Sequence, residues 1–261
     1  MSDAKLFNDG ESYERRTGRW SRLVGHAFLE WLAVPNGARW IDVGCGTGAF
    51  TEAVIERCDP AAVSAMDPSE GQLAYARSRP AAKLAEFRVG DALALPYPDR
   101  NFDAATMALV ISFVPDPLKA IMEMKRVVKS GGTVGAYMWD FAGGGLPVEP
   151  MHRALKSMGV AVSIPGLDVA GRDRMQALFE KAGLQSVETR VIRIPVGYAD
   201  ADEFWEQFRV PEGPLGLAMR KMSLSDIEKL KVRVRDFLPA GPDGRIAYEA
   251  FANAVKARVP D

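Results

Sequence analysis

From Arg39 to Asp140 the chain alternates short apolar runs with longer stretches in which apolar residues recur at helical spacing. The short runs are typical of buried strands and the longer stretches of amphipathic helices. Strands are predicted at 39–43, 62–67, 83–91, 101–109 and 132–140, and helices at 47–57, 69–78 and 117–128. Because strands that alternate with helices need crossover connections, this pattern predicts an α/β fold with a doubly wound, mostly parallel sheet.

The segments outside this core are mainly helical. Ahead of the core, we expect one helical face to pack against the sheet, with an apolar stripe of Trp20, Leu23, Val24, Ala27, Phe28 and Trp31. The expected segments are an N-terminal helical lid at 1–36, the α/β core at 37–140, a lid loop with a helix at 141–171, a core helix and strand at 172–199, a helical cap insertion at 200–244 and a final core strand at 245–261. On its residues alone the last segment stays open between strand and helix, because its alanines favour a helix.

Composition excludes several classes of protein. The 33 basic and 34 acidic residues nearly cancel, so no excess of positive charge attracts nucleic acid. The first residues contain no apolar signal core, and no apolar run is long enough to span a bilayer, which predicts a cytoplasmic protein without membrane contact. The two cysteines provide neither a disulfide framework nor a zinc ligand set.

The first predicted strand leads into a glycine loop, "RWIDVGCGTGAF" at residues 39–50. A glycine loop between a strand and a helix brings backbone N–H groups and the positive end of the helix close to a ligand. Taken as Gly44, Gly46 and Ala49, the loop also satisfies the dinucleotide fingerprint, so an NAD- or FAD-dependent oxidoreductase is an alternative here. The residues around the loop have to decide which ligand it approaches.

Acidic residues stand at the ends of the first three predicted strands. Asp42 precedes the glycines, where it would repel a pyrophosphate but attract a cationic amino group. Asp67 closes the second strand, where a carboxylate can accept hydrogen bonds from both hydroxyls of a ribose, a feature that fits either ligand. Asp91 follows the third strand. An amino acid joined to a nucleoside therefore fits these positions better than a dinucleotide.

The motifs "IDVGCGTG", "MDPS", "GDALALP", "NFD" and "VVKSGG" follow one another in this order between Trp40 and Asp140. In these residues the chain resembles the class I S-adenosylmethionine-dependent methyltransferases, in particular the small-molecule branch that includes the ubiquinone and menaquinone biosynthesis enzymes. The resemblance implies a Rossmann-like, seven-stranded sheet with an antiparallel final strand, so we favour a strand at 245–261. It implies S-adenosyl-L-methionine as cofactor and S-adenosyl-L-homocysteine as product. The insertion at 200–244 departs from the family core and would form a helical cap.

The resemblance also implies roles for individual residues. The backbone of Gly44, Cys45 and Gly46 would wrap the methionine part of the cofactor. Asp42 would orient this loop and the amino group of the methionine part.

Further positions follow from the same resemblance. Asp67 would hold the ribose hydroxyls, while Asp91 and the N–H of Ala92 would bind the adenine. Met66, Pro68 or Leu93 would supply apolar contact to the adenine ring, and Ala108 and Leu109, at the end of the fourth strand, would face the sulfonium.

The segment "YERRTGRWSR" looks like one that lies over the cofactor in a subgroup of the family. An arginine there could neutralise the methionine carboxylate, and a tyrosine could close the site against water. We expect Arg19 to hold the carboxylate, with Arg16 as the next choice, and Tyr13 to act in the lid.

Methyl transfer from a sulfonium is an in-line displacement, so most of the acceleration can come from holding nucleophile and methyl in line with water excluded. A base is needed only if the acceptor must lose a proton. The catalytic residue is therefore left open, with His152 and Asp140 as candidate bases near the expected lid.

The acceptor is expected to be a small molecule with an apolar part. After the fourth strand the chain carries the apolar "ALVISFVPD", where methyltransferases of nucleobase amino groups carry a polar [DN]-P-P-[YF] stretch. Large apolar residues of the expected lid support this acceptor: Trp139, Phe141, Met151, Trp205 and Phe208. The sequence leaves open which atom is methylated, whether the protein is a monomer or a homodimer, and whether it only binds the cofactor without catalysis.

Overall fold

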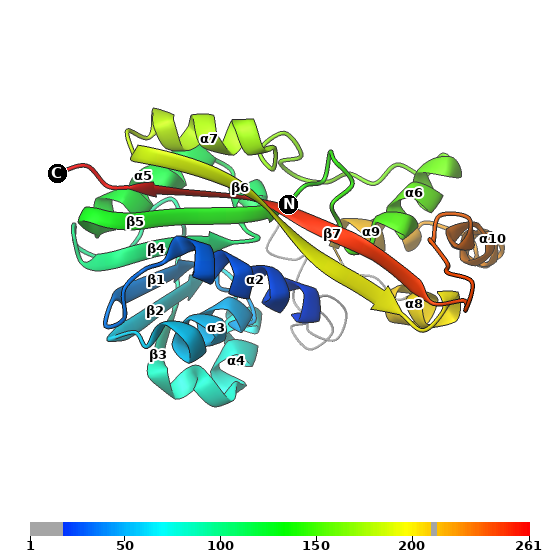
Figure 1. The fold of residues 1–261 in the computed structure, drawn as a ribbon, viewed down its shortest axis with the longest axis horizontal. Helices are drawn as coiled ribbons and strands as arrows, with labels where there is room; N and C mark the ends of the chain where they lie inside the picture. The colour runs from blue at the N-terminus through cyan, green and yellow to red at the C-terminus, as the bar shows by residue number, and fades with distance from the viewer. Residues whose placement is uncertain (1–17, 210–212) are drawn as a thin grey trace.

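Seven strands form one sheet in the computed structural model, which describes residues 18–209 and 213–261 (Figure 1). The strands are β1 (Arg39–Val43), β2 (Ala62–Asp67), β3 (Ala85–Val89), β4 (Phe102–Ala108), β5 (Val128–Trp139), β6 (Gln185–Tyr198) and β7 (Ile246–Arg258). The α-helices are α2 (Arg19–Leu32), α3 (Ala49–Cys58), α4 (Glu70–Ser78), α5 (Pro117–Val127), α6 (Glu149–Ser157), α7 (Arg172–Lys181), α8 (Ala201–Phe208), α9 (Gly213–Met219) and α10 (Leu224–Arg235). Two short 3₁₀ helices are η3 (Pro80–Leu84) and η4 (Ile111–Phe113).

The strand order is β3-β2-β1-β4-β5-β7-β6. Neighbours from β3 to β5 pair in parallel, whereas β7 runs antiparallel to both β5 and β6. The predicted fold class, a doubly wound and mostly parallel sheet with an antiparallel final strand, is confirmed. In such a sheet a ligand binds beyond the carboxyl ends of the strands where the order reverses, which here is between β1 and β4.

Helices cover both faces of the sheet (Figure 1). The first three described helices, α2, α3 and α4, lie on one face, and α5 and α7 lie on the other. The helices α6, α8, α9 and α10 gather beyond the carboxyl ends of the parallel strands, where the long strands β6 and β7 extend past the rest of the sheet. Residues from several of these elements therefore surround the edge at which the ligand is expected.

Side-chain caps explain where two helices near that edge begin. Ser69 precedes α4, and its hydroxyl accepts a hydrogen bond from the Gln72 N–H. Asp116 precedes α5, where its carboxylate accepts from the Lys119 N–H and Pro117 occupies the first helical position. Both arrangements satisfy N–H groups that the first turn of a helix leaves without a partner.

Two local features differ from the sequence analysis. The buried face of α2 includes Ser21 and Gly25, while Leu23 is 42% exposed, so the apolar stripe is rotated relative to the one expected. The glycines after α5 do not simply stop that helix: β5 already begins at Val128, which pairs with Phe102 ahead of a shift in register. Among the described residues, every helix is too short or too polar to cross a membrane.

Candidate active site

The glycine loop between β1 and α3 has the backbone conformation that its glycines permit. Gly44, Gly46 and Gly48 have φ angles of 77°, 52° and 78°, a region that other residues rarely adopt. A Cβ atom on Gly44 would lie 2.6 Å from Cγ1 of Val110, beyond the end of β4. The loop is therefore held against β4, and only glycine fits at its first position.

Hydrogen bonds from β2 and its last residue fix this loop. The N–H groups of Gly44 and Cys45 donate to the Met66 carbonyl at 2.7 and 2.8 Å. The Gly46 N–H donates to Oδ2 of Asp67 at 2.9 Å, and the Ser69 N–H donates to Oδ1 of Asp67 at 2.8 Å. The loop-orienting role that the sequence analysis gave to Asp42 thus falls to Asp67. Each carboxylate oxygen of Asp67 can still accept a further hydrogen bond.

Asp42 is buried below the loop, with 1% of its surface exposed. Its Oδ2 accepts a hydrogen bond from the Thr51 hydroxyl at 2.7 Å, and its Oδ1 has no hydrogen-bond partner among the described residues. Burial, with a smaller contribution from the Asp67 charge, raises the pKa of this carboxyl to about 7 against the lowering effect of the Thr51 hydrogen bond. A buried carboxylate with an unpaired oxygen suits a cationic group of a ligand.

One large cavity, of about 420 Å³, lies at the carboxyl ends of β1, β2, β4 and β5. Nine residues expected to bind the cofactor line this cavity: Asp42, Gly44, Cys45, Gly46, Asp67, Pro68, Asp91, Ala92 and Leu109. Its volume lies in the range usual for small-molecule sites. The nine residues come from the ends of β1, β2, β3 and β4, which thus meet at one cavity as the strand order requires.

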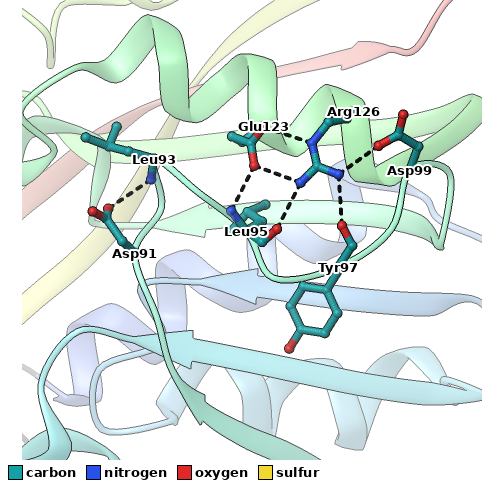
Figure 2. Close-up of polar contacts among 7 residues, drawn as sticks. All are labelled: Asp91, Leu93, Leu95, Tyr97, Asp99, Glu123 and Arg126. Atoms are coloured by element: carbon teal, nitrogen blue, oxygen red, sulfur yellow. Dashed lines mark hydrogen bonds and ion pairs between the residues drawn. The ribbon is translucent and has the colours of Figure 1, made fainter.

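Two residues of this set have informative local geometry. Asp91 is exposed, and its Oδ1 accepts a hydrogen bond from the Leu93 N–H at 2.9 Å, which leaves Oδ2 available (Figure 2). Leu109 has a φ of 62°, and its N–H donates to the Tyr137 carbonyl at 2.9 Å. A branched side chain in the left-handed region carries strain of a kind found at functional sites.

The outer end of the cavity is apolar. Its lining comes from segments after β4 and β5 and from the helices beyond the sheet: Phe113, Val114, Pro115, Trp139, Phe141, Leu146, Pro147, Val148, Ile164, Phe208, Pro214 and Leu215. None of these side chains is ionisable. Of the five lid residues expected from the sequence, Trp139, Phe141 and Phe208 line the cavity, whereas Met151 and Trp205 are buried in the core.

Arg19 is not at the cavity, which corrects the expectation for the carboxylate partner. Its guanidinium lies 3.8 Å from the Trp20 ring centroid and donates to the Gly197 carbonyl at 3.0 Å. Arg22, one turn further along α2, lines the cavity instead. Among the described residues Arg22 has no hydrogen-bond or ion-pair partner, and the sequence analysis missed it. Tyr13 and Arg16 lie outside the described residues.

The two candidate bases are also away from this cavity. His152 lies on α6 with Nδ1 3.7 Å from Oε2 of Glu149. Asp140 accepts a hydrogen bond from the Gly143 N–H at 2.8 Å and lines a separate cavity beside α7, together with Arg172. Neither side chain lines the large cavity, so the structure supports neither as the base.

Tyr137 is a cavity residue that the sequence analysis did not single out. Its side chain is buried, and its ring centroid lies 4.8 Å from that of Phe28 and 5.9 Å from that of Phe50. Its position near the carboxyl end of β5 was the signal available in the sequence.

Comparisons with known proteins agree with this geometry. A family model described as "Methyltransferase domain" matches residues 41–135. The chain is 29% identical over 197 residues to the demethylmenaquinone methyltransferase of Staphylococcus aureus, a match that covers 66% of this chain and 80% of the relative. It is 42% identical over 94 residues to 2-methyl-6-phytyl-1,4-hydroquinone methyltransferase 2 of Oryza sativa subsp. japonica, which covers 36% of this chain and 27% of the rice protein's own length.

A solved structure shares the fold and contains the expected cofactor. It is Haemonchus contortus phosphoethanolamine N-methyltransferase 2 in complex with S-adenosyl-L-methionine, with a TM-score of 0.57 at 19% identity, covering 91% of this chain and 52% of that one. The buried, half-paired carboxylate of Asp42 fits the amino group of that molecule, whereas it would repel the pyrophosphate of a dinucleotide. Residues 41–135 match a methyltransferase domain, and strand order, site geometry and relatives together support a class I S-adenosylmethionine-dependent methyltransferase.

Proposed function

We propose that the chain methylates a small acceptor whose apolar part lies in the outer end of the large cavity, and that this acceptor is a hydroquinone with an apolar side chain. The observation that carries the proposal is that one cavity is lined both by the glycine loop with its acidic strand ends and by an apolar set from the segments beyond the sheet. The rice and Staphylococcus aureus relatives are named for quinone-type substrates, which supports a hydroquinone as the class of acceptor. The segments 141–171 and 200–244 would serve as lid and cap.

The polar end would hold the cofactor, which supplies a methyl group activated on a sulfonium. In the proposed arrangement Asp42 binds the amino group, Arg22 the carboxylate and Asp67 the ribose hydroxyls. Asp91 and the Ala92 N–H bind the adenine. The support is that these residues line one cavity and that Asp42 and Arg22 carry charges opposite to those of the methionine part.

The apolar end would exclude water and position the acceptor. The apolar lining residues described above cannot take up a proton. The acceptor therefore needs a nucleophile that can react before it loses a proton. A hydroquinone has one, since its hydroxyl groups make the ring carbons nucleophilic. The new C–CH3 bond forms as the S–CH3 bond of the sulfonium breaks, and the hydrogen on that ring carbon then leaves as a proton to solvent. Alignment and exclusion of water then supply the acceleration.

Methyl transfer to a panel of acceptors tests this proposal. We expect release of S-adenosylhomocysteine, and one added methyl group by mass spectrometry, with hydroquinones that carry an alkyl or isoprenoid chain. The oxidised quinones and a polar amine of similar size should give no product. Turnover of the amine, or no turnover of any hydroquinone by protein that binds S-adenosylhomocysteine, would contradict the acceptor class.

Arg22→Met is expected to weaken binding of S-adenosylhomocysteine about tenfold, because it removes the cation proposed to face the carboxylate. The measurement is titration calorimetry. The matched ligand is 5′-methylthioadenosine, which keeps the nucleoside and lacks the carboxylate, and its affinity should not change. Equal loss for both ligands would show that Arg22 acts on the fold of α2 rather than on the carboxylate.

A further inference from the structure

The guanidinium of Arg126, on α5, is bonded to the loop that carries Asp91 (Figure 2). We call residues 90–101, between β3 and β4, the adenine loop. Arg126 donates to the Leu95 carbonyl at 2.9 Å, to the Tyr97 carbonyl at 2.8 Å and to Oδ1 of Asp99 at 2.8 Å. One side chain of a helix thus contacts three positions along this loop.

Glu123 completes the contact from one turn earlier on the same helix. Its carboxylate accepts from Nε of Arg126 and from a terminal nitrogen of Arg126, both at 2.8 Å, and also from the Leu95 N–H at 2.8 Å. The Glu123 and Arg126 side chains are 19% and 31% exposed. The hydrogen bond from Arg126 lowers the pKa of Glu123, so this carboxyl stays charged. A two-point pair between planar groups fixes orientation as well as distance.

This pair reaches the cavity through a short turn. Both the N–H and the carbonyl of Leu95 are held, and the side chain of Leu95 is buried. One residue earlier, the Ala94 N–H donates to the Asp91 carbonyl at 3.0 Å, and the Leu93 N–H donates to Oδ1 of Asp91. The orientation of the Asp91 carboxylate at the cavity wall therefore depends on where Leu95 is held.

We propose that Arg126 is a positioning residue for the cofactor: with Glu123 it sets the geometry of the adenine loop, and thereby the preference of the site for adenine. This inference rests on the proposed placement of the adenine amino group at Asp91. Arg126 does not line the cavity, and it acts by fixing the loop before the ligand binds, which reduces the ordering cost of binding.

The test compares two ligands that differ only at the base. S-adenosylhomocysteine has an amino group that can donate to Asp91, whereas S-inosylhomocysteine has a carbonyl oxygen at that place. The wild type should bind the adenine ligand at least tenfold more tightly. In Arg126→Met the affinity for the adenine ligand should fall about tenfold, while the affinity for the inosine ligand changes little. Glu123→Gln, which keeps an acceptor for the Leu95 N–H, should show a smaller loss in the same direction.

Lys129→Met is the matched control. It removes an ion pair from the same region, Lys129 Nζ to Asp103 Oδ1 at 2.6 Å, without touching the adenine loop, and should leave base preference unchanged. Amide exchange by NMR gives a second readout, since the Leu93 and Leu95 N–H groups should exchange faster in Arg126→Met.

The outcomes separate the two ideas. A folded Arg126→Met that keeps the wild-type base preference and the wild-type Leu93 exchange rate overturns the proposal, because Arg126 then only stabilises α5. A wild type that binds both ligands equally overturns the placement of adenine at Asp91 and the base-preference proposal with it. Equal losses for both ligands in Arg126→Met would show a general loosening of the site and would also contradict it.

Discussion

Asp67→Ala should weaken the binding of S-adenosylhomocysteine about a hundredfold, or by about 2.8 kcal/mol. Two effects of the substitution contribute to this loss of affinity. The substitution removes the proposed acceptor of the ribose hydroxyls, and it also releases the Gly46 and Ser69 N–H groups that Asp67 holds in place. Hydrogen bonds to a charged acceptor are each worth about 1.5–3 kcal/mol, so a loss of this size is expected even after partial compensation by water. Titration calorimetry measures it directly.

A pair of ligands separates the two contributions. The wild type should bind 2′-deoxy S-adenosylhomocysteine less tightly than the parent molecule, whereas Asp67→Ala should bind the two alike, as in a double-mutant cycle. If the variant still prefers the ligand with the hydroxyl group, Asp67 does not hold the ribose. Circular dichroism is the control for folding of the variant.

Asp42→Asn should change how stability depends on pH. The pKa of Asp42 is about 7 in the folded protein and near 3.8 when the chain is unfolded, because burial penalises the charge. Between these two values the folded state holds a proton that the unfolded state has lost. The stability of the wild type relative to Asp42→Asn should therefore fall as pH rises, by up to about 1.4 kcal/mol per pH unit and roughly 4 kcal/mol in all, and level off above pH 7.

Urea unfolding of both variants from pH 4 to pH 8 tests this expectation. Other groups with shifted pKa values, such as Asp67 and His26, are common to both variants and largely cancel in the difference. A stability difference between wild type and Asp42→Asn that does not vary with pH would contradict the expectation.

Proton release on binding is a second measurement. A cationic amino group beside Asp42 favours the ionised carboxylate, so the wild type should release a proton on binding S-adenosylhomocysteine at pH 6. Asp42→Asn should release none from this position.

The strand ends of the site could be predicted from the sequence because the fold alone brings them together. Once alternating strands and helices imply a parallel sheet, residues that close neighbouring strands must lie at one edge. Asp42, Asp67 and Asp91 needed no knowledge of side-chain packing to be placed there. The second role of Asp67, as acceptor for the Gly46 N–H, depends on the path of the loop, which no periodicity reveals.

The choice between Arg19 and Arg22 depended on the rotation of one helix. The stripe expected on α2 included Leu23, but small residues at Ser21 and Gly25 let that side of the helix approach the site. Arg22 lies three residues before Gly25 and shares its side of the helix, whereas Arg19 packs on Trp20. Rotating the buried face of α2 by a fraction of a turn is enough to place Arg22, rather than Arg19, at the cavity.

The candidate bases, His152 and Asp140, do not line the large cavity, because their side chains point elsewhere. Trp139 ends β5 and lines the large cavity, whereas Asp140 begins the turn after the strand, where its carboxylate accepts from the Gly143 N–H and lines the cavity beside α7. On α6 the buried positions include Met151 and Leu155, and His152 lies beside Glu149 instead. Proximity in sequence to the lid did not determine the direction of either side chain.

The position of β7 inside the sheet has a consequence for the order of folding. Strand β6 pairs only with β7, and β7 joins it to β5, so in the described sheet β6 has no partner until residues 246–258 have been made. The ribosome therefore releases β1 to β5, with every strand end of the cofactor site, well before α8, α9 and α10 can be fixed to the sheet. We expect the nascent chain to form an early cofactor-binding half, and the acceptor half only after a late, long-range strand insertion, which is the step most exposed to misfolding.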